Sequence, residues 1–139
     1  MKLPTFLVVG IEKAGTTSIY QYLNQHPQVY MSPVKETNFL ERDWENFQGK
    51  PNPKRIDTWE KYCNLFKDVQ DEVAIGGVSP NYLFHYKFSS LRIIKYVPDV
   101  KMIAILRNPV DRAYSDYLMH LRDSINMEKV HSLTEQVRF

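Results

Sequence analysis

The chain has 139 residues, of which 43% are hydrophobic and 24% are charged. This composition is typical of a globular domain with a hydrophobic core and excludes a disordered chain. The formal net charge of +2 excludes bulk attraction to nucleic acid, so any anion site depends on the local placement of charge. The single cysteine, Cys63, excludes an internal disulfide and a cysteine-rich metal site. Its position predicts a half-buried thiol in a helix.

The sequence shows no membrane or secretion signal. No apolar run approaches the roughly 20 residues that cross a bilayer. The N-terminus lacks the longer apolar core and the small-residue cleavage site of a signal peptide. These features favour a cytoplasmic protein. Residues 132–139 contain no helix-ending signal, and we expect a single nucleotide-binding domain over residues 1–139 that is truncated at its C-terminus.

The first half of the chain alternates strand and helix patterns. The continuous apolar run at 5–10 suits a strand that is covered on both faces of a parallel sheet. A helix over 16–25 and a short strand over 29–31 follow. A second helix over 58–66 begins at Thr58, a residue type that caps helix N-termini. The apolar residues expected on one face of these two helices are Ile19, Tyr22 and Leu23, and then Trp59, Tyr62, Cys63 and Phe66.

The second half continues the alternation. The sequence predicts a strand over 73–78, a helix over 89–97 and a buried strand over 101–106. Asn108 caps a last helix that runs to about residue 122. Alternating strands and helices predict an α/β fold with a mostly parallel sheet. The apolar residues expected on one side of the two helices are Leu91, Ile94 and Val97, and then Val110, Tyr114, Tyr117, Leu118 and Leu121.

The loop after the first strand is the strongest functional signal. Residues 10–18 read Gly-Ile-Glu-Lys-Ala-Gly-Thr-Thr-Ser. A buried strand, a glycine loop and a helix N-terminus together build a cradle for a phosphate or sulfate group. In contrast to the Walker pattern, Lys13 comes two residues before Gly15. An ordinary glycine turn with a hydroxyl helix cap is the alternative. The candidate anion ligands are Lys13, Ala14, Gly15, Thr16, Thr17 and Ser18.

A second candidate anion site follows the predicted strand at 101–106. Arg107 at the carboxyl end of a parallel strand points into the crevice where such sheets bind ligands. Its guanidinium can bind a phosphate with two parallel hydrogen bonds. Ser115, two turns into the next helix, could donate one more. The alternative is a surface ion pair between Arg107 and Asp111 or Asp116.

Together these segments resemble the sulfotransferases that use 3′-phosphoadenosine-5′-phosphosulfate (PAPS), over about residues 6–121. Residues 13–18 match the loop for the 5′-phosphosulfate, and residues 107–115 match the motif for the 3′-phosphate. The match is closest to the branch of bacterial and heparan sulfate sulfotransferases, which carries a similar His-Pro pair (26–27) and Lys-Glu motif (35–39). The resemblance implies a P-loop-like three-layer fold with helices flanking the sheet. It also implies direct sulfuryl transfer to a hydroxyl or amine.

The resemblance further implies a role for each matched side chain. Lys13 would hold the oxygen between phosphate and sulfonate, and Glu36 would be the general base. The phosphate ligands would be Thr16, Thr17 and Ser18 at the 5′ end and Arg107 and Ser115 at the 3′ end. Sulfuryl transfer, like phosphoryl transfer, depends mostly on positioning and charge stabilisation. Because the sulfonate carries less charge than a phosphoryl group, we expect no metal.

The identity of the base stays open at this stage. The acceptor must lose a proton, so a carboxylate near the sulfonate is expected. Without the resemblance, Glu36 would be interpreted as a solvated loop carboxylate. In the branch that acts on phenols and steroids a histidine serves instead, and the best-placed histidine is His85. The other histidines, each more typical of a structural or exposed position, are His26, His120 and His131. Lys35 could contact the sulfonate or an anionic acceptor.

The acceptor and two alternative functions also stay open. We expect PAPS and an acceptor as partners, the acceptor being a carbohydrate, lipid, peptide or small metabolite. Residues 79–82 resemble the segment that lines the acceptor side, although Val78 stands where many heparan-type members carry lysine. The alternatives are a P-loop-like small-molecule kinase, which needs ATP and Mg²⁺, and a non-catalytic nucleotide-binding fragment. Three alternating aromatic residues could line an acceptor pocket, but this pattern is more typical of strand or core positions: Tyr82, Phe84 and Tyr86.

Overall fold

A computed structural model of the chain describes residues 2–44, 46–49 and 52–136, without the side chains of 126–136. The chain divides into two compact units, Met1–Leu106 and Arg107–Phe139. The first unit holds the sheet and the second holds one long helix. Among the described helices, none combines the length and apolar character that a membrane span requires.

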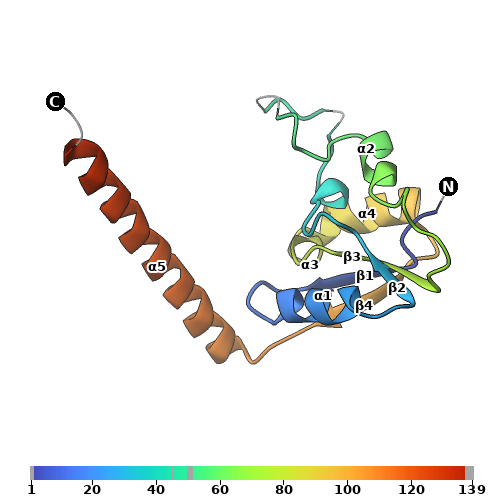
Figure 1. Ribbon diagram of the computed structural model, residues 1–139, viewed down its shortest axis with the longest axis horizontal. Helices are drawn as coiled ribbons and strands as arrows, with labels where there is room; N and C mark the ends of the chain where they lie inside the picture. Colours follow the sequence, from blue (N-terminus) through green and yellow to red (C-terminus); the bar gives the residue numbers. More distant parts are fainter. Residues whose placement is uncertain (1, 45, 50–51, 137–139) are drawn as a thin grey trace. The chain divides into compact units, whose positions relative to one another are not determined.

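Four parallel strands form the sheet of the first unit (Figure 1). Their order is β2-β3-β1-β4, which places β1 between two neighbours. Because every pair is parallel, all four carboxyl ends lie at one edge of the sheet. The strands predicted from the sequence are confirmed, with bounds β1 Phe6–Gly10, β2 Val29–Met31, β3 Ala74–Val78 and β4 Lys101–Ile105.

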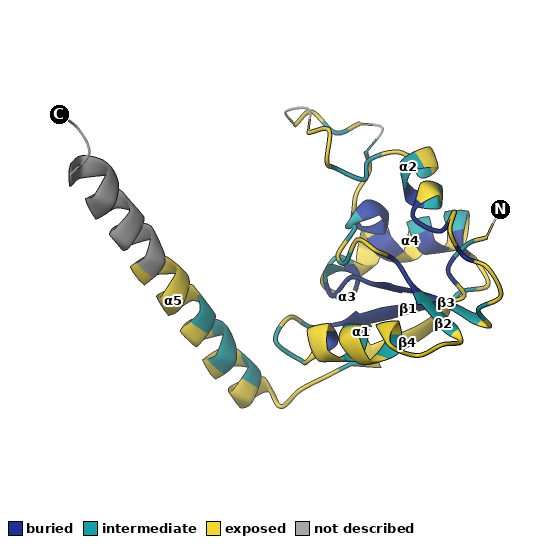
Figure 2. Ribbon diagram, viewed as in Figure 1, coloured by how far each residue is buried: buried dark blue, intermediate teal, exposed yellow. Residues whose placement is uncertain are grey.

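Helices cover both faces of this sheet, which confirms the three-layer α/β fold (Figure 1). Side chains alternate between the two faces along β1. Leu7 and Val9 belong to the core shared with α2, η1, α3 and α4, whereas Phe6 and Val8 belong to the core shared with α1. All four are buried (Figure 2). The helical elements of this unit are α1 Thr16–Asn24, η1 Phe39–Glu41, α2 Trp59–Asn64, α3 Asn81–Phe84 and α4 Tyr86–Tyr96.

Several burial predictions were wrong, among them that of Tyr22 on α1, which is 71% exposed. The strand predicted as buried, β4, exposes Met102 by 55% and Ile103 by 45%, because β4 lies at the edge of the described sheet and pairs there with β1 alone. On α4, Leu91 and Ile94 are exposed and Ile93 is buried, whereas Val97 at the C-cap is buried as predicted. The buried positions start at Ser89 and repeat every four residues. Because the first of them is a small polar residue, the pattern of apolar residues alone does not reveal this face.

The segment after β3 also differs from the prediction. It forms the short helix α3 and then α4 rather than a strand. Tyr82 is buried, as a core position requires, but Phe84 and Tyr86 are 79% and 60% exposed. Within α3, Tyr82 and Phe84 lie on different faces because they are two residues apart, and Tyr86 begins a separate helix, α4.

The second unit contains α5, Pro109–Gln136, which is longer than the predicted helix. Its predicted cap is confirmed. The Asn108 Oδ1 atom accepts a hydrogen bond of 2.9 Å from the Val110 N–H, and the Asn108 carbonyl accepts one of 2.9 Å from the Arg112 N–H. Asp111 lies in the first turn, where negative charge stabilises a helix.

A buried carboxylate lies in η1. Glu41 is 4% exposed, and its Oε1 atom lies 3.3 Å from Arg42 Nη2. Burial raises the pKa of this carboxyl above its ordinary value of 4.5, and the charges of Arg42 and His85 oppose that rise. The folded protein therefore binds a proton at Glu41 more tightly than the unfolded chain does.

We expect the stability of the wild-type protein to fall, relative to Glu41→Gln, as the pH rises from 4.5 through the raised pKa of Glu41. In this window the folded state holds more protons than the unfolded state, so the slope of the unfolding free energy against pH is negative. Urea unfolding of both proteins between about pH 4 and pH 7 measures the difference. Parallel stability curves across the window would contradict this expectation.

Candidate functional site

The candidate site lies at the carboxyl edge of the sheet in the first unit. The segments after β1, β2 and β3 all leave the sheet at this edge. The chain continues from β1 into α1 on one face and from β3 into α3 and α4 on the other (Figure 1). Adjacent strands whose connections diverge in this way leave a crevice between them, which is where open α/β sheets bind ligands.

The loop between β1 and α1 has the geometry of an anion cradle. Gly15 is the N-terminal cap of α1 with φ of 99°, and Lys13 also has a left-handed φ of 68°. No side chain caps this helix, which contradicts the alternative of an ordinary hydroxyl cap. A Cβ atom at Gly15 would have no atom within 4 Å, so the space in front of it is open. The first N–H groups of α1, which have no acceptor inside the helix, are therefore available to an anion.

The three predicted hydroxyl ligands of this loop differ in exposure. Thr16 is buried, whereas Thr17 and Ser18 are exposed at the start of α1. The Thr17 Oγ1 atom accepts a hydrogen bond of 2.9 Å from Lys35 Nζ. The structure thus adds a second lysine beside the loop, from the segment that follows β2.

Lys35 connects the loop to the candidate base. Its ammonium also lies 2.5 Å from Glu36 Oε1, with 26% and 39% of the two side chains exposed. The Glu36 backbone has a left-handed φ of 59°, and its N–H donates a hydrogen bond of 2.8 Å to the carbonyl of Val78, the last residue of β3. The carboxylate is therefore held at the carboxyl edge of the sheet and is linked through one ammonium to the anion loop.

Tyr82 holds the segment that follows Glu36 in place, a role that the sequence did not reveal. Its hydroxyl shares a hydrogen bond of 3.0 Å with Thr37 Oγ1 and accepts one of 3.4 Å from the Leu40 N–H. Burial raises the pKa of the Tyr82 phenol, so the side chain stays neutral at physiological pH. Tyr82 thus anchors the segment that carries Glu36. That residues 79–82 line the acceptor side stays a prediction.

The two histidines of the first unit, His26 and His85, contact residues outside the anion loop. His26 Nδ1 accepts a hydrogen bond of 3.2 Å from the Gln28 N–H in the turn after α1. His85 lies between α3 and α4, where its ring meets Phe84 edge to face at 4.9 Å. His120 lies on α5, 3.9 Å from Asp116. The side chain of His131 lies outside the described residues. Within the first unit, Glu36 is linked through Lys35 to the anion loop, which favours it over His26 and His85 as the base.

Arg107 and Ser115 belong to the second unit. Arg107 follows the carboxyl end of β4 by two residues and is exposed, and Ser115 is half-buried on α5. The register of β1 and β4 pairs Gly10 with Ile105, so the two strands end at the same level. That Arg107 and Ser115 bind the same ligand as the loop stays a prediction.

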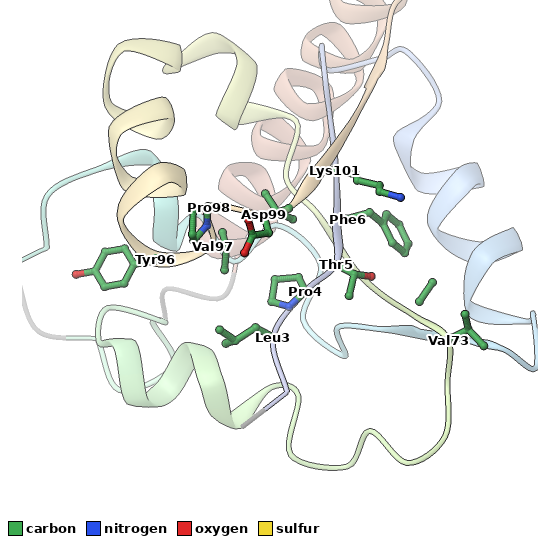
Figure 3. Close-up of a pocket in the computed structure, with 12 residues that line it drawn as sticks. Leu3, Pro4, Thr5, Phe6, Val73, Tyr96, Val97, Pro98, Asp99 and Lys101 are labelled. Carbon is green, nitrogen blue, oxygen red and sulfur yellow. The ribbon is translucent and has the colours of Figure 1, made fainter.

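Two cavities of the first unit lie at opposite edges of its sheet. One, of about 560 Å³, lies at the amino ends of the strands, beside residues such as Thr5 and Lys101 (Figure 3). It contains none of the predicted site residues and lies at the edge that parallel sheets do not use for ligands. The other, of about 320 Å³, includes Glu36 in its wall. Among the described residues, no cluster of side chains suits a metal ion.

Comparison with known proteins agrees with this arrangement. A solved sulfotransferase from Alicyclobacillus acidocaldarius superposes with a TM-score of 0.77 and 39% identity, covering 89% of this chain and 52% of that one. Human heparan sulfate glucosamine 3-O-sulfotransferase 6 is 30% identical over 95% of this chain and 35% of its own length. Mouse bifunctional heparan sulfate N-deacetylase/N-sulfotransferase 4 is 34% identical over 83% of this chain and 13% of its own length. The chain thus spans about half of the solved structure and about a third or less of these curated relatives. A model of the sulfotransferase domain matches residues 3–137, and the chain therefore belongs to the sulfotransferase domain family.

Proposed function

We propose that the protein transfers a sulfuryl group from PAPS to a hydroxyl or amine of an acceptor. The observation that carries this proposal is the position of Lys35, which contacts both Thr17 of the anion loop and the carboxylate of Glu36. A carboxylate this close to an anion cradle is suited to remove the proton of an acceptor that attacks the bound sulfonate. The two motifs for the 5′ and 3′ phosphates support PAPS as the donor.

Each residue of the first unit has a defined task in this proposal. The N–H groups at the start of α1, with Gly15 leaving room in front of them, bind the 5′-phosphate. Lys13 places its charge where negative charge develops on the leaving phosphate. Glu36 accepts the acceptor proton, and Lys35 holds that carboxylate in place. The donor itself supplies the sulfuryl group, and no proton transfer or charge stabilisation in this scheme requires a metal.

Two competing functions have weaker support. A P-loop-like small-molecule kinase would need lysine directly after the second glycine, and here Lys13 precedes it. A non-catalytic nucleotide-binding fragment would need neither Glu36 nor its ion pair with Lys35. The cytoplasmic location, the single domain over residues 1–139 and the roles of Arg107 and Ser115 stay predictions.

Transfer of ³⁵S from labelled PAPS by the full-length protein, scored against a mixed panel of hydroxyl and amine acceptors, tests the proposal. We expect Lys13→Ala to lower turnover on the order of 10²- to 10³-fold, because charge on the leaving phosphate loses its stabilisation. Glu36→Gln should lower turnover on the order of 10²- to 10⁴-fold. It should leave binding of adenosine 3′,5′-bisphosphate unchanged.

A parallel assay with labelled ATP distinguishes the kinase alternative from the sulfotransferase. If the wild-type protein transferred label from γ-³²P-ATP in the presence of Mg²⁺, and none from PAPS, the sulfotransferase proposal would be wrong. If Glu36→Gln abolished nucleotide binding, the carboxylate would have a structural role and its assignment as the base would fail.

We expect Lys35→Met to lower kcat by at least about tenfold, because the variant removes the charge that holds Glu36 next to the loop. Steady-state assays with saturating PAPS measure this effect. Lys87→Met, which changes an exposed lysine on α4, is the matched control and should keep the wild-type kcat. An unchanged kcat in Lys35→Met would contradict the role of this ion pair.

A further inference from the structure

The backbone around the candidate base has an unusual conformation. Glu36 and Asn38, on either side of Thr37, are both left-handed, with φ of 59° and 55°. For residues with a Cβ atom this conformation carries a steric cost, and it persists where the surrounding structure enforces it. The direction in which the Glu36 carboxylate leaves the chain therefore depends on the contacts that hold this short segment.

Hydrogen bonds to the sheet hold the first part of the segment. The Ser32 N–H donates a hydrogen bond of 2.8 Å to the Gly76 carbonyl, and the Glu36 N–H donates one of 2.8 Å to the Val78 carbonyl. Both acceptors belong to β3. These bonds fix the chain as far as Glu36, and the residues that follow it depend on other groups.

The hydroxyl of Tyr82 on α3 holds the residues that follow. It shares a hydrogen bond of 3.0 Å with Thr37 Oγ1 and accepts one of 3.4 Å from the Leu40 N–H. These two contacts lie before and after Asn38, the left-handed residue at the start of η1. One hydroxyl thus bridges the second left-handed residue, and its loss would release the chain on both sides of that residue.

Tyr82 is itself fixed by the fold. Its side chain is buried and belongs to the core cluster that includes Leu7 and Phe39. The Tyr82 N–H donates a hydrogen bond of 3.1 Å to the Ser79 carbonyl, and the Ser79 N–H donates one of 3.1 Å to the Val8 carbonyl on β1. The hydroxyl is therefore connected rigidly to the central strand. Groups whose side chains are locked by packing are suited to position a catalytic residue.

We propose that Tyr82 is a positioning residue for Glu36: its hydroxyl, through Thr37 and Leu40, holds the left-handed segment in the conformation that keeps the carboxylate beside the anion loop. The inference rests on the proposed function, in which Glu36 is the base. The phenol takes no part in the proton transfer, because its burial keeps it neutral. Its effect on turnover therefore passes through the carboxylate alone.

Amide hydrogen exchange of the full-length protein, followed by NMR, tests the positioning without turnover. In Tyr82→Phe the ring and its packing remain, and the Glu36 N–H keeps its own acceptor. We expect that N–H to exchange at least about fivefold faster, the effect of one lost hydrogen bond on local opening. The Ser32 N–H should keep its rate, whereas a general loss of stability would raise both rates alike. An unchanged Glu36 rate, or an equal rise at Ser32, would overturn the proposal.

Two further variants locate the effect. Thr37→Val removes a hydroxyl from the same contact and leaves Tyr82 in the core, so it should also accelerate exchange at Glu36, and it decides the matter if Tyr82→Phe does not fold. The matched control is Tyr30→Phe, which removes a tyrosine hydroxyl that donates a hydrogen bond of 2.9 Å to the Leu65 carbonyl. This control should leave the Glu36 rate unchanged. A comparable acceleration in Tyr30→Phe would overturn the assignment to Tyr82.

Kinetics with ³⁵S-labelled PAPS, and the acceptor of the panel that reacts fastest, measures the consequence for turnover. Tyr82→Phe should lower kcat at least about tenfold and leave the KM for PAPS unchanged, because the base is displaced while the nucleotide site is intact. In the Glu36→Gln background the same substitution should have no further effect on kcat. An equal loss in both backgrounds would overturn the proposal. If the wild type does not bind adenosine 3′,5′-bisphosphate, the proposed function fails, and the exchange rates still decide whether Tyr82 holds the segment.

Discussion

The burial of β1 on both faces is the constraint from which the rest of the site follows. Leu7 and Val9 contribute to the core on one face, and Phe6 and Val8 to the core on the other. A strand fixed in this way gives the anion loop a rigid starting point, and functional groups are positioned best from such elements. At its end, Gly10 approaches β4 so closely that a Cβ atom would lie 2.6 Å from the Ile105 carbonyl oxygen. The close pairing of β1 and β4 therefore depends on glycine at this position.

The polar part of the site depends on connections between segments that are far apart in the sequence. The Glu36 N–H bonds to the end of β3, and the Lys35 ammonium bonds to Thr17 at the start of α1. Both Lys13 and Glu36 have left-handed backbone conformations, which carry a steric cost for residues with a side chain. Such conformations persist where the surrounding structure enforces them, and they concentrate at functional sites. The two residues proposed for catalysis are thus held by the fold in positions that a flexible loop would not keep.

Much of the fold was predictable because its signals are local. The apolar run of β1, the glycine of the anion loop and the Asn108 cap each follow from a few adjacent residues. Burial was less predictable, since it depends on neighbours: Ile103 is exposed because β4 is an edge strand. The cavity beside Glu36 could not be predicted, because it requires Arg42 and Arg55, which are thirteen positions apart in the sequence, to meet the same Trp44 ring.

The central claim is that the anion loop and the motif at 107–115 bind opposite ends of one bisphosphorylated adenosine. Calorimetry of the full-length protein with adenosine 3′,5′-bisphosphate and with AMP, in the wild type and in Arg107→Ala, tests it directly. The account predicts that the wild type prefers the bisphosphate by on the order of 100-fold, the contribution of a well-placed guanidinium to a phosphate. In Arg107→Ala this preference should disappear while the affinity for AMP stays unchanged. Equal affinity of the wild type for the two nucleotides would contradict the account.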